Sequence, residues 1–99
     1  MRLLAAVLAL AGLSACGPVQ STASLIDADV ALEAARAAGA ATTATYEFTG
    51  AEAYLHKARE AEGRAQYEAS AEFAETARDL ARTAREKATA ASNKSEPSL

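Results

Sequence analysis

The sequence predicts an all-α protein, in which a signal peptide precedes a small antiparallel helical hairpin or three-helix, alanine-rich bundle with a long C-terminal helix. Two observations predict this fold. Alanine, the residue with the highest helix propensity, accounts for 29 of the 99 residues. The apolar residues in the middle of the chain recur at spacings of three and four, without the alternation typical of strands. A chain of this length allows one small domain.

The first residues have the pattern of an export signal. Met1 and Arg2 give a short positive start, and residues 3–13 form an uncharged apolar run. Such a run spans only about 16 Å as a helix at about 1.5 Å per residue, against a hydrocarbon core of about 30 Å. We therefore interpret residues 1–15 as a signal peptide and not as a membrane-spanning helix.

The end of this run carries a lipidation pattern. Leu13, Ser14, Ala15 and Cys16 stand in the order aliphatic residue, two small residues, cysteine. This order resembles the lipobox of bacterial lipoproteins. The resemblance implies cleavage between Ala15 and Cys16, and acylation of Cys16 on its sulfur and its new amino group by fatty chains such as palmitate. The alternative is an ordinary secretory signal with an incidental cysteine, which would leave one free thiol in a secreted protein.

The lipid would also fix the location of the protein. Two or more acyl chains hold a protein stably at a membrane, at about 0.8 kcal/mol per buried methylene group. Gly17 stands where many inner-membrane lipoproteins carry aspartate, so the resemblance indicates the outer membrane of a bacterial cell envelope, on its periplasmic face. We expect residues 16–23, which are small and polar and include Gly17 and Pro18, to form the lipidated N-terminus and a tether.

The helical domain is predicted over residues 24–91, and its first helix over residues 25–38. Ser24 and Asp27 resemble a capping box, and Gly39 stands where a helix-terminating glycine belongs. One apolar stripe follows the helical repeat and consists of Leu25, Ala28, Leu32 and Ala35.

A second helix is predicted over residues 46–62, with Thr45 as its N-cap. A start near Ala51 is the alternative, because Thr49 and Glu52 form a second capping box. Gly63 marks the end of this helix, and residues 64–66 form the turn. The earlier start places one apolar face on Phe48, Ala51, Leu55, Ala58 and either Ala61 or Glu62.

The third helix, over residues 65–91 with Tyr67 as the alternative start, has the most regular pattern. Two sets repeat every seven residues and interleave as a heptad seam, Tyr67, Ala74, Ala81 and Ala88 with Ser70, Ala77, Ala84 and Ala91. Phe73 and Leu80 widen this seam on one side. Alanine buries little area per residue, so we expect the domain to self-associate or to dock on another envelope protein through the exposed end of this helix. Residues 92–99 lack periodicity and are expected to be disordered.

The sequence contains no recognisable arrangement of catalytic residues, so we do not expect an enzyme. The formal net charge of -3 argues against nucleic-acid binding, the single cysteine excludes an internal disulfide, and no paired His or Cys has the spacing of zinc ligands. Glu52 and His56 share a helical face, but no nucleophile or second ligand accompanies them, which favours a simple polar pair. We expect no metal, no cofactor and no small-molecule substrate.

Three arginines form the candidate partner surface. Arg78, Arg82 and Arg85 make the second half of the third helix basic, while its first half is acidic. A basic strip could bind lipid head groups or an acidic partner. The alternative interpretation is that the gradient only complements the helix macrodipole.

From residue 31 to residue 88 the order of motifs resembles small bacterial lipoproteins that carry domain of unknown function 4398. The matching segments are ALEAARAAGA at 31–40 and YEFTGAEAYLHKAREAEGRAQYEASAEFAETA at 46–77. The resemblance implies a helical envelope lipoprotein of unassigned activity, whose relatives are sometimes joined to or found beside peptidoglycan-binding OmpA-like domains. Thr45 replaces a proline that this family often has.

Two functional hypotheses follow. The first is a lipid-anchored, non-enzymatic helical module that acts as an envelope adaptor. The second is an oligomeric coiled-coil spacer between membrane and cell wall, similar to murein lipoprotein. One observation speaks against the spacer. Murein lipoproteins use a terminal lysine for cross-linking, whereas this sequence ends in Pro97, Ser98 and Leu99.

Overall fold

The protein is all-α in its computed structural model, which describes the backbone of residues 2–95 and the side chains of residues 2–6 and 17–94. No strand occurs within these residues, as the sequence predicts. The helices are α1 (Arg2–Ala37), α2 (Ala40–Thr43), α3 (Thr45–Gly63) and α4 (Tyr67–Ser95).

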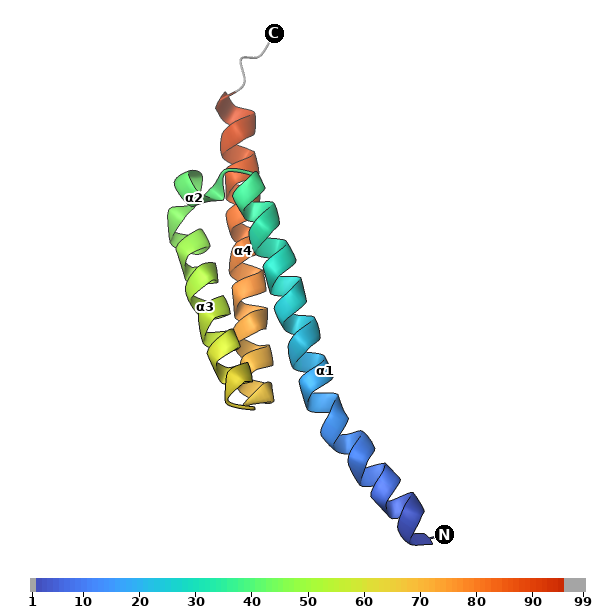
Figure 1. Cartoon of the computed structure of the whole chain (residues 1–99). Coiled ribbons are helices and arrows are strands. Elements are labelled where there is room, and N and C mark those ends of the chain that lie inside the picture. The colour runs from blue at the N-terminus through green and yellow to red at the C-terminus, as the bar shows by residue number, and fades with distance from the viewer. Residues whose placement is uncertain (1, 96–99) are drawn as a thin grey trace.

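The long helix α4 is the centre of the assembly. It packs extensively against both α1 and α3, whereas α1 and α3 contact each other over a much smaller area. Figure 1 shows α3 and α4 as an antiparallel hairpin with α1 along its other side. The N-terminal part of α1 projects beyond the α3–α4 turn, and the C-terminal part of α4 projects beyond α2 at the opposite end (Figure 1).

The core combines large residues from the outer helices with small residues from α4. Leu25 and Leu32 of α1, and Phe48 and Leu55 of α3, are all buried. They pack with a row of buried alanines on α4, which we call the alanine seam and which consists of Ala74, Ala77, Ala81, Ala84 and Ala88. Small side chains let helix axes approach closely, and the leucines and phenylalanine fill the remaining volume. The stripes predicted for α1 and α3 are thereby confirmed, and Ala61, not Glu62, completes the one on α3. The stripe predicted for α4 is confirmed from Ser70 to Ala88, whereas Tyr67 and Ala91 at its two ends are only half-buried.

The prediction that residues 16–23 form a tether outside the fold is wrong. These residues continue α1 without a break, so this helix does not begin near Leu25. Ser21 is fully buried, and a Cβ on Gly17 would lie 3.7 Å from the side chain of Tyr67. Packing against α4 therefore outweighs the weak helix propensity of the segment, and Pro18 removes only one backbone hydrogen bond from α1.

The helix ends confirm the two predicted C-terminal ends and correct the two predicted N-terminal caps. Ser24 and Asp27 do not cap a helix, because both lie inside α1. Gly39 ends α1 in the left-handed conformation (φ 84°), as predicted. Thr45 is not an N-cap; it is the first residue of α3, preceded by Ala44, and its hydroxyl donates to the carbonyl of Ala41 (3.0 Å). As predicted, Gly63 is the last residue of α3 and residues 64–66 form the turn, in which Ala65 is the left-handed residue (φ 60°).

The turn after α3 is closed by backbone hydrogen bonds. The amide of Gln66 donates to the carbonyl of Ala61 (2.8 Å), and the amide of Ala65 donates to the carbonyl of Glu62 (2.9 Å). This pair of bonds defines a Schellman motif, with Ala65 in the position that glycine usually occupies.

The C-terminal helix is longer than predicted. It begins at Tyr67 and continues to Ser95, so the expectation of disorder from residue 92 is wrong for residues 92–95. Lys94 lies in its last turn, where a positive charge interacts favourably with the helix macrodipole. Residues 96–99 lie outside the described residues.

Candidate functional site

The predicted attachment site lies in α1, ahead of the part that packs on the bundle. The backbone at Ala15 and Cys16 is helical, and their side chains lie outside the described ones. Leu3 and Leu4 are 84% and 68% exposed, so the described part of the predicted signal peptide contributes nothing to the core. Contact with the bundle is present at Gly17, the residue that follows Cys16.

A chain of buried hydrogen bonds joins the three long helices close to this site. The hydroxyl of Ser21 on α1 donates to the hydroxyl of Ser70 on α4 (2.9 Å). The Ser70 hydroxyl donates in turn to the carbonyl of Ala58 on α3 (2.8 Å). Both serines are fully buried, so these bonds satisfy groups that would otherwise be costly to remove from water. We call this chain the serine link.

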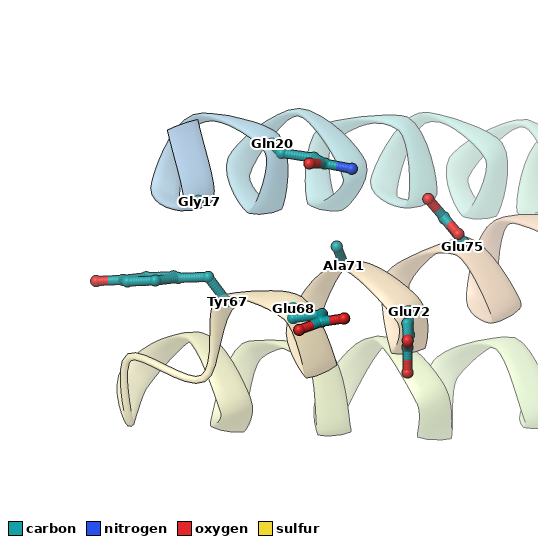
Figure 2. A pocket seen from close by; sticks show the side chains of 7 residues that line it. All are labelled: Gly17, Gln20, Tyr67, Glu68, Ala71, Glu72 and Glu75. Carbon is teal, nitrogen blue, oxygen red and sulfur yellow. The ribbon is translucent and has the colours of Figure 1, made fainter. Parts of the chain in front are cut away.

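A cleft opens between α1 and α4 beside the serine link. It has a volume of about 420 Å³ and is lined by Gly17, Gln20, Tyr67, Glu68, Ala71, Glu72 and Glu75. Figure 2 shows Ala71 and Glu75 pointing toward α1, whereas Glu72 points away from it. The carboxylates therefore do not converge. In the part of the chain that the structure describes, no group of three or more His, Cys, Asp and Glu side chains could hold a metal ion.

The structure places the three predicted arginines in two environments. Arg78 is half-buried and donates to its neighbour Asp79 (3.2 Å). Arg82 and Arg85 are exposed and form no ion pair within residues 17–94. They line a shallow groove on α4 together with Glu86, Thr89, Ala90 and Asn93. The candidate partner surface is thus reduced to Arg82 and Arg85.

The polar pair predicted between Glu52 and His56 does not form. Nε2 of His56 lies 3.1 Å from Oε1 of Glu60, one helical turn in the other direction. Glu52 instead faces Arg36 of α1, at 4.0 Å. The imidazole of His56 is 75% exposed, so it has neither the burial nor the partners of a catalytic group.

One ion pair ties α3 to the distal half of α4. The ammonium of Lys87 donates to Oε1 of Glu47, whose side chain is only 13% exposed. The hydrogen bond from Lys87 lowers the pKa of the Glu47 carboxyl below its usual value, with a smaller contribution from a backbone hydrogen bond. This pair holds the start of α3 against α4.

Sequence reasoning missed an apolar surface on α1, directly opposite the stripe that faces the core. Val19, Ile26 and Val30 are 68%, 57% and 65% exposed. Together with the exposed Ala23 they form what we call the outer face of α1. Spacings of four, three and four residues place all four on one side of the helix. The same spacing is present in the sequence, but interpreting residues 16–23 as a tether hides it.

The comparisons with known proteins give no match. No family model matches the chain, and neither a curated protein nor a solved structure matches it. The resemblance to lipoproteins with domain of unknown function 4398 therefore stays a prediction. Among the described residues, no helix combines the length and the hydropathy that crossing a membrane requires.

Proposed function

We propose that this chain is a lipid-anchored, non-enzymatic envelope protein whose helical bundle acts as an adaptor at the periplasmic face of the outer membrane. The observation that carries the proposal is the segment Leu13–Ser14–Ala15–Cys16 directly behind an apolar run of signal-peptide length. Attachment raises the effective concentration of the bundle for any partner at the same membrane.

The packing of α1 supports cleavage before Cys16. Removal of residues 1–15 leaves every described core residue in place, because the buried positions begin at Ser21. Cleavage would also move Pro18 from the interior of α1 to its first turn. Proline is tolerated there, because the amide that it lacks has no helical acceptor in the first turn.

The covered alanine seam favours the adaptor over the coiled-coil spacer. A spacer built on the heptads of α4 would need this seam for contacts between chains. Here Ala74, Ala81 and Ala88 are at most 1% exposed, because α1 and α3 of the same chain cover them. We therefore expect residues 17–99 to sediment as a monomer or loose dimer, and a stable trimer would favour the spacer.

Lipidation is tested by the mass of the mature protein and by one substitution. We expect the native protein to begin at residue 16 and to carry the added mass of its acyl chains. Cys16→Ser should leave an uncleaved, mislocalised precursor, whereas Ser14→Ala, which keeps a small residue in the motif, should be processed normally. A bare thiol on native material, or normal processing of Cys16→Ser, would contradict the proposal.

The adaptor role is tested through Arg82 and Arg85. Crosslinking in intact cells, followed by purification of the lipidated protein, should recover a defined envelope partner. Replacing both arginines by glutamine should reduce the recovery of that partner at least several-fold, without changing the helicity of the protein. The control is Arg64→Gln, because Arg64 is also an exposed arginine and lies at the other end of the bundle. Equal recovery with all variants would remove Arg82 and Arg85 from the proposed interface.

A further inference from the structure

The link between the proposed anchor and the bundle is helical. Residues 17–23 belong to α1, Gly17 and Tyr67 line the same cleft, and Ser21 takes part in the serine link. Residue 16 is therefore joined to the packed helices without a break in α1. A lipid attached at Cys16 would fix the distance of the bundle from the membrane and also limit its orientation.

The outer face of α1 begins beside that attachment point. Val19 is three residues from Cys16, and Val30 lies about 21 Å further along the helix than Cys16, at about 1.5 Å per residue. The part nearest the anchor is a shallow, almost entirely apolar depression lined by Pro18, Val19, Thr22, Ala23 and Ile26. An exposed apolar stripe of this kind marks a surface that contacts lipid or protein.

Two of the three carboxylates on α1 beside this face are paired with arginines. Asp29 is bonded to Arg59 of α3 (2.5 Å), and Glu33 is paired with Arg36. Asp27 shares a groove between α1 and α4 with Arg82 and Arg85. The pairing of Asp29 and Glu33 reduces the negative charge that α1 presents to phosphate head groups beside this face.

The position of Glu33 favours a lipid surface over a second copy of the chain. Glu33 continues the line of the outer face beyond Val30, and its side chain is 68% exposed. In a parallel pair of helices, Glu33 of the two copies would lie opposite each other in the seam. At a membrane, the apolar side chains contact lipid, while the exposed Glu33 at the far end of the line reaches the polar head groups and water.

We infer that the outer face of α1, Val19, Ala23, Ile26 and Val30, lies against the membrane to which Cys16 is attached, so that the bundle lies along the bilayer surface. This inference rests on the proposed lipidation of Cys16. Binding of this kind combines an acyl anchor with a partly inserted helix face, and both contribute to the free energy of membrane binding. The α3 side of the bundle then faces the aqueous compartment.

The test uses the full lipidated protein in phosphatidylcholine vesicles, with and without bromine atoms on the acyl chains. Acylated Cys16 has no free thiol, so Val30→Cys provides a single site for an environment-sensitive fluorophore. The matched control is Ala53→Cys on the exposed side of α3, away from α1. We expect brominated lipid to quench the label at position 30 at least two-fold more than the label at position 53. Adding Ile26→Glu should reduce that quenching.

Three other results of this experiment would overturn the inference. Equal quenching at positions 30 and 53 would mean that the bundle does not lie on this face. A blue-shifted label at position 30 that brominated lipid does not quench, with dimers in sedimentation, would assign the face to a second copy. The intact mass of the same sample reports lipidation separately. Lipid present without quenching refutes the orientation alone, whereas a native protein without lipid refutes the proposed function as well.

Discussion

The hydroxyl of Ser21 donates a 2.9 Å hydrogen bond to the hydroxyl of Ser70, across the interface between α1 and α4. Ser70 belongs to the heptad pattern of α4, at a position otherwise occupied by alanine. A serine there keeps the side chain small and adds a polar contact that only one register of α1 satisfies. The bond therefore specifies how α1 lies on α4, close to the proposed anchor.

A double-mutant cycle measures this bond. Ser21→Ala leaves Ser70 bonded to the carbonyl of Ala58, so we expect a loss of about 1 kcal/mol. Ser70→Ala leaves the Ser21 hydroxyl buried without its partner and should cost about 1–2 kcal/mol. The double variant should lose less than the sum of the single variants in urea unfolding. Strict additivity would mean that the two hydroxyls do not interact.

Ala65 is a site for stabilisation. Its φ of 60° lies in the left-handed region, which costs a residue with a Cβ roughly 1–2 kcal/mol. Ala65→Gly should therefore raise the free energy of unfolding by about 1 kcal/mol. The matched reverse substitution is Gly39→Ala, which places a Cβ at φ 84° and should lower stability by a similar amount. A thermal melt in which the two variants shift in the same direction would contradict this account of the turns.

The alanine seam should not accept charge. Ala77 is 2% exposed, and Ala77→Glu would bury a carboxylate without a partner, at a cost of roughly 3 kcal/mol or more. The control is Ala90→Glu, the same substitution at an exposed position of α4, which should stay within about 0.5 kcal/mol of the parent. Circular dichroism melts compare the two. Similar melts would mean that the seam is accessible to water.

The pair of Glu47 and Lys87 should make stability depend on pH. The pKa of Glu47 is lowered in the folded state, chiefly by the hydrogen bond from Lys87. Its contribution is present above the unfolded value of about 4.3 and is lost as the pH falls through the lowered folded pKa. Glu47→Gln should therefore be less stable than the parent at pH 7, and the difference should shrink in acid. Lys87→Met should show the same loss of pH dependence, and a difference that is constant from pH 7 to pH 3 would refute the assignment.

The sequence predicts the packing of this protein well, because a period of three and four leaves little choice of face. Leu25 and Leu32 on α1, and Phe48 and Leu55 on α3, are buried as predicted. The alanine seam of α4 is predicted for the same reason. An interleaved heptad pattern alone does not distinguish contacts within a chain from contacts between chains.

The errors fall where local propensity and tertiary packing disagree. Gly17 and Pro18 indicate a break, but contacts that only the fold creates, with Tyr67 and Ser70, keep the segment helical. Ser24 and Asp27 indicate the start of a helix, yet both lie inside α1, because the segment before them stays helical. The outer face of α1 was missed as a consequence of the first error.

The alanine seam of α4 also limits which substitutions this protein tolerates. A single base change in an alanine codon leads to glycine, serine, threonine, valine, proline, aspartate or glutamate. At Ala81 and Ala84, where the residue is completely enclosed, the larger or charged replacements would force the helices apart, and proline would break α4. Substitutions in the alanine seam should therefore be confined almost entirely to glycine and serine, whereas the solvent-facing side of α4 should accept many residue types.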